Sequence, residues 1–307
     1  MKKWSRFHRK MAVAWVQLEY QLITQGGFLM HHRKVALVTG ASSGIGNAIA
    51  KSLHRNGVTV YAGARRVERM NDLDDLGITT LPLDVTDAQS VEHTVDRIVS
   101  ETGRIDILVN NAGFGLLGAL EDLTIDQAQA QFDVNLFGAA RLIQSVLPMM
   151  RQQHTGRIIN VTSIDGKVAQ PLASWYVASK FALEGLSDAL RFELRPHGID
   201  VVVIEPGSIQ SEWADIASDH LQAASGTGPY AATTTQAVAI LKAAKRFASG
   251  PQVIARLADR AALSRRPKTR YHAGAGSSIL WLRRCLSDRT LDRIWRVVGQ
   301  AAQRITR

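Results

Sequence analysis

The chain has 307 residues, which is enough for one large domain or two small ones. Its net charge is +10, but the basic residues gather at the ends: residues 1–33 hold six Lys/Arg and one Asp/Glu, and residues 260–307 hold twelve and two. The middle is therefore mildly acidic, which argues against a nucleic-acid-binding body. A single cysteine, Cys285, excludes an intramolecular disulfide, the nine histidines lack metal-ligand spacing, and no apolar run is long enough to span a membrane.

Residues 1–33 form a basic segment that starts like a signal peptide, with MKKWSRFHRK followed by MAVAWV. The apolar run ends after about six residues, which is too short for a secretory signal. Because Met30 directly precedes the first expected strand, we interpret residues 1–33 as an extension that is non-native or disordered. The alternative is a peripheral amphipathic segment that touches a membrane.

A strand is expected at 34–39, a helix at 47–55 and a second strand at 58–62. The turn between the first strand and the helix reads Gly40-Ala41-Ser42-Ser43-Gly44-Ile45-Gly46. Glycines in such a turn let the backbone approach a pyrophosphate, and the helix N-terminus offers free N–H groups. The spacing is one residue longer than the common dinucleotide fingerprint, so the prediction depends on the position between strand and helix.

Further strands are expected at 78–81, 105–109, 157–161, 200–204 and 268–272. Helices are expected at 86–101, 124–150, 233–248 and 252–262, and a helix that carries Tyr176 and Lys180 is expected to continue to about 195. This alternation predicts an α/β fold: a Rossmann-type, doubly wound, mostly parallel sheet of about seven strands with helices on both faces. We place this single domain at 34–275. Its Ser/Gly-rich segment 212–228 is expected to be irregular and to start a substrate lid that extends to about 262.

Residues 276–307 are predicted to form a basic amphipathic helical tail. Apolar residues recur at helical spacing in 278–286 and 291–298, with arginines between them. The tail could pack on the domain or on a partner subunit, or it could contact an anionic membrane.

Chemistry is predicted where the strand at 157–161 gives way to the helix that carries Tyr176 and Lys180. Residues four apart lie on the same helical face, so the phenol and the ammonium can address one site. A nearby positive charge lowers the pKa of a phenol from its ordinary value of about 10. Tyr176 is therefore a candidate general acid/base, and Ser163 could supply a hydroxyl to the same substrate oxygen.

These motifs, in this order, resemble the short-chain dehydrogenase/reductase family. The resemblance covers about 34 to 211 and rests on Thr39-Gly40-x-x-x-Gly44-x-Gly46, Asn110-Asn111-Ala112-Gly113, Asn135, Ser163, Tyr176-x-x-x-Lys180 and Pro206-Gly207. It implies a catalytic set of Asn135, Ser163, Tyr176 and Lys180. In this set Asn135, through its side chain or a distorted backbone, anchors a water behind the lysine and completes a proton relay.

The same resemblance implies a cofactor site. Its members are the glycine turn with Gly40, Ser42, Ser43, Gly44, Ile45 and Gly46, the adenine contacts Asp84 and Val85, the turn Asn111, Ala112 and Gly113, the nicotinamide contacts Pro206, Gly207, Ile209 and Ser211, and also Arg65, Tyr176 and Lys180.

Arg65 is the residue on which the choice of cofactor depends. Family members that use NAD usually carry an acidic residue where Ala64 stands. Arg65 follows, and a guanidinium can bind a 2′-phosphate through two hydrogen bonds. NADP is therefore favoured over NAD. We interpret Arg66 and Arg69 as solvated residues.

The segment 114–118, FGLLG, is apolar where a loop is usually polar, and in the family it borders the substrate pocket. Its sequence resembles the corresponding segment of family members that act on steroids, retinoids and other hydrophobic alcohols. Phe114 and Leu116 of this segment are therefore predicted substrate contacts. Trp175, next to Tyr176, is predicted as a third, beside Ser163 and Tyr176 themselves.

The sequence thus predicts an NADP(H)-dependent oxidoreductase that acts on CH–OH donors and interconverts a hydrophobic alcohol and its ketone or aldehyde. We expect a homodimer or homotetramer, a cytoplasmic location with peripheral membrane contact as an option, and no nucleic-acid partner. Two alternatives stay open: a non-catalytic nucleotide-binding regulatory or structural protein, and a nucleic-acid or membrane-surface binder that uses the basic ends.

Overall fold

A computed structural model describes residues 33–283 and 285–306, and residues from Lys34 onward form one compact unit. The predicted extension at 1–33 therefore lies outside the described residues, apart from Arg33.

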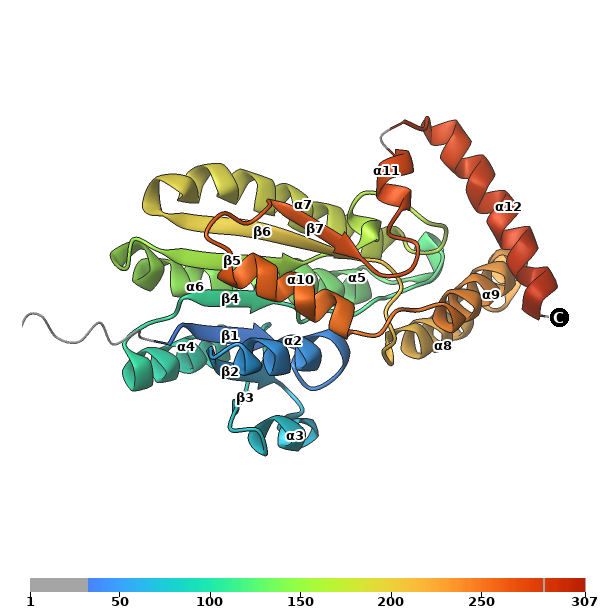
Figure 1. The fold of residues 1–307 in the computed structure, drawn as a ribbon. Helices are drawn as coiled ribbons and strands as arrows, with labels where there is room; N and C mark the ends of the chain where they lie inside the picture. Colours follow the sequence, from blue (N-terminus) through green and yellow to red (C-terminus); the bar gives the residue numbers. More distant parts are fainter. Residues whose placement is uncertain (1–32, 284, 307) are drawn as a thin grey trace, which may run out of the picture. The chain divides into compact units, whose positions relative to one another are not determined.

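Seven parallel strands form one sheet in the order β3-β2-β1-β4-β5-β6-β7 (Figure 1). The strands are β1 (Val35–Thr39), β2 (Thr59–Ala64), β3 (Thr79–Pro82), β4 (Ile107–Asn110), β5 (Gly156–Val161), β6 (Ile199–Pro206) and β7 (Arg270–Ala273). The predicted doubly wound fold is confirmed, with every pair of neighbouring strands parallel.

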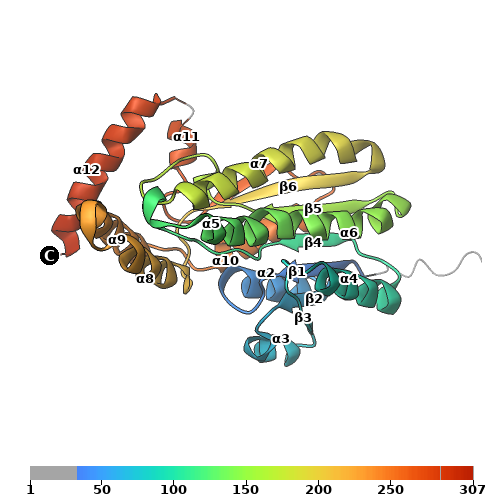
Figure 2. The same cartoon turned by 180° about the vertical axis from the view of Figure 1, so that it is seen from behind.

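Helices cover both faces of the sheet. One face carries α2 (Gly44–Arg55), α3 (Asn71–Asp74) and α10 (Gln252–Leu263), and the other carries α4 (Ala88–Thr102), α6 (Ala139–Gln152) and α7 (Ser174–Leu194), which come to the front in Figure 2. Alternate residues of β1 contribute to the two cores: Ala36 and Val38 face α2 and α10, whereas Val35 and Leu37 face the other layer. Burial on both faces explains why this strand is a continuous apolar run.

The chain between 124 and 152 is distorted where a single helix was expected. Helix α5 (Ile125–Phe132) starts with a capping box between Thr124 and Gln127, and a π-helical turn over Asp133–Gly138 leads into α6. A π-turn widens the hydrogen-bond register by one residue and is frequent at functional sites.

The segment 212–228 is mostly helical, so the expectation that it is irregular is wrong, whereas its role as a lid stays a prediction. It forms α8 (Trp213–Ser225), which is followed by α9 (Ala231–Arg246). Ala217 and Leu221, one turn apart, are fully buried against the domain, and this apolar stripe explains the helix.

The tail forms two helices, α11 (Ile279–Arg283) and α12 (Asp288–Thr306), close to those expected. Helix α12 packs along α9 at the carboxyl end of the sheet (Figures 1 and 2). The tail is thus part of the compact unit.

Candidate active site

A cavity of about 720 Å³ lies outside the carboxyl ends of β1, β2, β4, β5 and β6. In open parallel sheets, ligands bind at this edge, where the strand order reverses between β1 and β4. The predicted catalytic and cofactor residues that line the cavity are Gly40, Ser42, Ser43, Gly44, Ile45, Arg65, Asp84, Val85, Asn111, Ala112, Gly113, Ser163, Tyr176, Lys180, Pro206, Gly207, Ile209 and Ser211.

The glycine turn leaves room for a dinucleotide pyrophosphate. Gly40 has φ +66°, and a Cβ on it would lie 2.8 Å from the Ala112 Cα. Ser43 is the N-cap of α2 but makes no capping hydrogen bond, so the first N–H groups of the helix stay free for an anion. Gly46 does not line the cavity, contrary to its predicted role; a Cβ there would overlap the Gly40 carbonyl, so it allows close packing of the turn.

Asn111 ties the turn after β4 to β1. Its Nδ2 donates to the Thr39 carbonyl at 2.9 Å, and the Thr39 hydroxyl accepts from the N–H groups of Asn111 and Ala112, both at 3.0 Å. Asn111 therefore has a structural role in addition to its position at the cavity.

The part of the cavity next to the ends of β2 and β3 holds a carboxylate and two arginines. Burial raises the pKa of Asp84, but hydrogen bonds from Thr86 and the charge of Arg65 outweigh it, so the pKa is lowered overall. Arg65 is exposed and lines the cavity, as does Arg66. Arg69 binds Glu212 through contacts of 2.7 and 3.0 Å. Arg66 and Arg69 are both exposed, as expected of solvated residues; in addition, Arg66 lines the cavity and Arg69 forms a surface ion pair.

Asn135 lies in the π-helical turn and is 1% exposed. Its Nδ2 donates to the Phe114 carbonyl at 2.9 Å and to Ser179 Oγ at 3.1 Å, and its Oδ1 accepts from the Phe114 N–H at 3.0 Å. The side chain holds the loop after β4. Both ends of the side-chain amide thus have protein partners, and the water anchor that the family resemblance implies stays a prediction.

Ser163, Tyr176 and Lys180 form one buried cluster. The Ser163 hydroxyl interacts with the Tyr176 phenol and accepts from the Asp165 N–H at 3.1 Å. Lys180 Nζ donates to the Val161 carbonyl at 3.2 Å and lies 5.8 Å from the centre of the Tyr176 ring. The strand end of β5 thus presents the hydroxyl, and helix α7 presents the phenol and the ammonium.

Burial dominates the electrostatics of this cluster. It raises the pKa of Tyr176 well above the ordinary range; the charge of Asp165 adds to this, and the hydrogen bond with Ser163 opposes it. Burial also lowers the pKa of Lys180 to about 8, against the charges of Asp165 and Glu184. The expected net lowering of the phenol pKa is not met, because burial disfavours the charged form of each group and is the largest effect on both.

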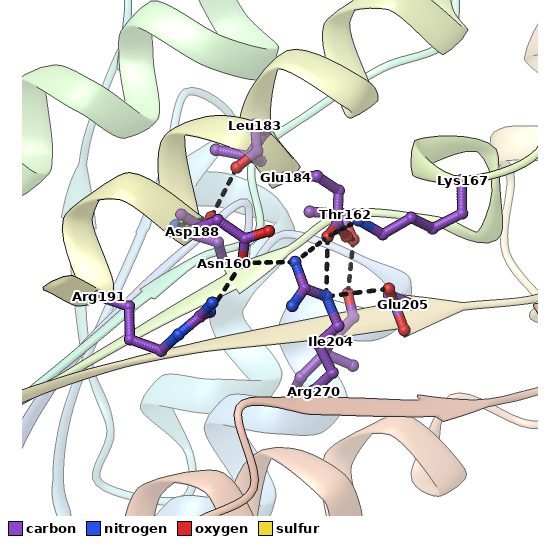
Figure 3. Close-up of polar contacts among 11 residues, drawn as sticks. Asn160, Thr162, Lys167, Leu183, Glu184, Asp188, Arg191, Ile204, Glu205 and Arg270 are labelled. Carbon is purple, nitrogen blue, oxygen red and sulfur yellow. Dashed lines mark hydrogen bonds and ion pairs between the residues drawn. The ribbon is translucent and has the colours of Figure 1, made fainter.

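A buried ionic network fixes α7 behind the cluster (Figure 3). Glu184, one turn after Lys180, is 2% exposed and accepts from Thr162 Oγ1 at 2.7 Å. It pairs with Lys167 at 3.1 Å and with Arg270 of β7 at 2.9 Å. These contacts join β5, β7 and the helix that carries Tyr176.

Two predicted substrate residues lie away from the cavity. Leu116 is 5% exposed, and its N–H donates to Gln131 Oε1 at 2.6 Å. Trp175 packs edge-on against Phe132 at 6.4 Å. Phe114 does line the cavity.

The residues that close the cavity beside Tyr176 were not predicted from the sequence. Trp213, the first residue of α8, packs on Tyr176 with 5.4 Å between ring centres. Asp165 and Gln170 enter from the loop after β5, and α11 and α12 contribute Ile279, Ile294, Trp295 and Val298. The apolar spacing of 291–298 signalled a buried helix face, but only the fold shows that this face meets the cavity.

In the described parts of the chain, no three His, Cys, Asp or Glu side chains cluster in a way that could hold a metal ion. No helix in those parts is long and apolar enough to span a membrane.

A parallel sheet with a glycine turn at one helix N-terminus and a buried Ser-Tyr-Lys cluster at its carboxyl edge defines a nucleotide-binding oxidoreductase of the Rossmann type. The family profile described as short chain dehydrogenase matches residues 34–221. The chain belongs to the short-chain dehydrogenase/reductase family.

Two relatives illustrate the similarity. The uncharacterized oxidoreductase YbbO of Escherichia coli is 34% identical over 264 residues, which cover 85% of this chain and 94% of that protein. The 3-ketodihydrosphingosine reductase of Bacteroides thetaiotaomicron is 40% identical over 183 residues, which cover 59% of this chain and 66% of that protein.

Solved structures agree with this assignment. A short-chain dehydrogenase from Streptomyces avermitilis has a TM-score of 0.73 and 31% identity, covering 88% of this chain and 98% of its own. A Burkholderia phymatum member in complex with NAD has a TM-score of 0.71 and 26% identity, with coverage of 82% and 92%. A Thermococcus sibiricus alcohol dehydrogenase complexed with 5-hydroxy-NADP has a TM-score of 0.63 and 25% identity, covering 80% of this chain and 97% of its own. These neighbours support a nicotinamide cofactor.

Proposed function

We propose that the protein is an NADP(H)-dependent oxidoreductase that interconverts a hydrophobic alcohol and its ketone or aldehyde. The observation that carries the proposal is the position of Ser163 and Tyr176, which face the same cavity as the glycine turn while Trp213 and the tail helices line its other end. One cavity can therefore hold a dinucleotide and an apolar substrate together.

The residues of the chain transfer one proton and stabilise one developing negative charge. When bound, the nicotinamide cofactor supplies or accepts the hydride. In the reductive direction, the Tyr176 phenol donates its proton to the carbonyl oxygen, and the Ser163 hydroxyl donates a hydrogen bond to the same oxygen, where negative charge develops. Burial keeps the phenol protonated, which suits a proton donor. The Lys180 ammonium stabilises the phenolate that remains.

Arg65 supports the preference for NADP. Its exposed guanidinium lines the cavity next to Asp84, and the buried Ala64 offers no carboxylate that would repel a 2′-phosphate. A hydrophobic substrate is supported by Phe114, Trp213 and the apolar face of α12. A 3-ketodihydrosphingosine reductase is among the relatives of this chain, which supports a carbonyl compound as substrate.

The test is to assay long-chain ketones, steroids, retinoids and short alcohols with each cofactor. Turnover is monitored through the absorbance of the reduced nicotinamide. We expect the highest kcat/KM with NADPH and a long-chain or polycyclic carbonyl. A panel without turnover under either cofactor would favour a non-catalytic nucleotide-binding protein.

A further inference from the structure

The cavity contains a carboxyl group to which the proposed proton transfer assigns no role. Asp165 belongs to the short 3-10 turn Ile164–Gly166 after β5, is 8% exposed and lines the cavity. Its N–H donates to Ser163 Oγ at 3.1 Å, so the residue is attached to the hydroxyl that would contact the substrate oxygen.

Burial raises the pKa of the Asp165 carboxyl to about 7, against two hydrogen-bonding side chains and the charge of Lys180, which forms no direct ion pair with it among the described residues. Gln170 Nε2 donates to its Oδ2 at 3.0 Å, and the Ser163 hydroxyl also favours the charged form. In contrast, the equally buried Glu184 pairs directly with both Lys167 and Arg270. A buried carboxylate is stable when it is paired and hydrogen-bonded. Asp165 therefore has capacity for a further donor, and the cavity is the side from which one can come.

Ser163 lies between this carboxyl and the atoms that would react. Its hydroxyl interacts with both the Tyr176 phenol and the Asp165 carboxyl. Asp165 lines the same cavity as Ser163 and Tyr176, so a carbonyl oxygen bound between those two residues would set its neighbouring carbon in the part of the cavity that Asp165 borders. A donor group on that carbon would meet the carboxylate.

We propose that Asp165 binds an ammonium or hydroxyl group on the carbon next to the reacting carbonyl. The preferred substrates are then α-amino or α-hydroxy ketones, with the corresponding amino alcohols and diols as products. The apolar remainder of such a substrate would lie toward Trp213 and the α12 residues Ile294 and Trp295. This inference rests on the proposed function, because it uses the same Ser163 and Tyr176 site.

Asp165 could instead serve only as a clamp, since its contact with Gln170 closes the loop over 164–170. The two roles predict different effects of substitution. Loss of a clamp slows every substrate alike and should follow equally from Gln170→Ala. Loss of a donor site acts on donor-bearing substrates alone and should follow from Asp165→Asn but not from Gln170→Ala.

The experiment compares three ketones of the same chain length: unsubstituted, α-hydroxy and α-amino. For the wild-type chain with NADPH, we expect kcat/KM to be about tenfold to a hundredfold higher for a donor-bearing ketone, the factor of a charge-assisted hydrogen bond. Asp165→Asn should remove most of this ratio, mainly through KM, whereas Gln170→Ala should retain it. A larger ratio for the amino ketone than for the hydroxy ketone would identify an ammonium as the natural donor.

Equal kcat/KM for the three ketones in the wild-type chain would overturn the inference, and this comparison decides it even if Asp165→Asn does not fold. An equal loss on all three ketones in Asp165→Asn would assign the residue a positioning role and reject it as a donor site. The proposed function fails separately, if none of the three ketones is reduced with either cofactor.

Discussion

Tyr176 is the residue on which the proposed chemistry depends most directly. Tyr176→Phe keeps the ring against Trp213 but removes the proton donor. We expect kcat to fall at least a hundredfold, because general acid/base catalysis contributes about 10²–10⁴-fold. Binding of NADPH, measured by fluorescence titration, should persist because most of the cofactor wall lies elsewhere.

Tyr61→Phe is the matched control for this change. Tyr61 is equally buried, but it lies on β2 outside the cavity, and its hydroxyl donates to Glu101 at 2.7 Å. It should keep the wild-type kcat. If Tyr176→Phe retained more than a tenth of the wild-type rate, general acid/base catalysis by the phenol would be untenable.

Arg65 should determine the choice of cofactor. A charge-assisted hydrogen bond to the 2′-phosphate contributes roughly 1.5–3 kcal/mol, which is about tenfold to over a hundredfold in affinity. Arg65→Ala should therefore raise KM for NADPH by this factor and leave KM for NADH nearly unchanged. Ala64→Asp together with Arg65→Ala should invert the preference, because a carboxylate accepts hydrogen bonds from the ribose hydroxyls and repels a phosphate.

Arg69→Ala provides the control, since this arginine carries the same charge but pairs with Glu212. KM for both cofactors should stay close to wild type. Equal losses for NADH and NADPH in Arg65→Ala would make Arg65 structural, and a wild-type preference for NADH would refute the assignment to NADP.

Single residues were predictable where their chemistry has a local pattern. The glycine turn, Tyr176 and Lys180 stand at fixed spacings, and all of these residues except Ala41 and Gly46 line the cavity. Leu116 and Trp175 were misplaced because the direction of a side chain depends on how a loop or helix is rotated. Asp165 and Trp213 have no local signal, since their positions follow from the packing of distant segments.

At the scale of elements, the π-turn before α6 depends on a close approach. A Cβ on Gly138 would lie 2.7 Å from Val85 Cγ2 and 3.1 Å from the Asp133 carbonyl oxygen. Gly138→Ala should lower the free energy of unfolding by about 1–3 kcal/mol, the usual cost of overpacking. Because Val85 lines the cavity, the affinity for cofactor should fall as well.

Gly185→Ala in α7 is the opposite case, because a Cβ there meets nothing within 4 Å. It should raise stability by about 0.5–1 kcal/mol, since alanine is the better helix former. Urea denaturation of both variants checks the pair. A Gly138→Ala chain as stable as wild type would show that the turn relaxes around a methyl group.

The strands were the most predictable elements, because parallel strands buried on both faces leave continuous apolar runs. The π-turn was not predictable, because α5 before it and α6 after it have the same hydrophobic periodicity. Segment 212–228 was misjudged because its Ser and Gly content outweighed the buried pair Ala217 and Leu221.

At the scale of the whole molecule, the alternation of strands and helices predicted the doubly wound parallel sheet, but not which of several surfaces the tail would contact. Packing on the domain, on a partner subunit or on a membrane was open from the sequence, and in the structure α12 packs on α9 and reaches the cavity. Its outer side still exposes Val297 and Arg296, so contact with an anionic membrane stays a prediction.

The tail should therefore influence which substrates are accepted. Trp295 lies on the side of α12 that faces the cavity, whereas Val297 is 65% exposed. Trp295→Ala removes apolar surface from the outer wall, and a loss of about 1.4 kcal/mol of contact raises KM roughly tenfold. We expect this increase for a long-chain ketone, which extends to the wall, and a much smaller one for a short ketone, which stays near Tyr176. Val297→Ala should change neither KM. Steady-state kinetics on the two ketones decide it: equal KM changes for both would mean that α12 only supports the fold, and no change for either would place the substrate away from the tail.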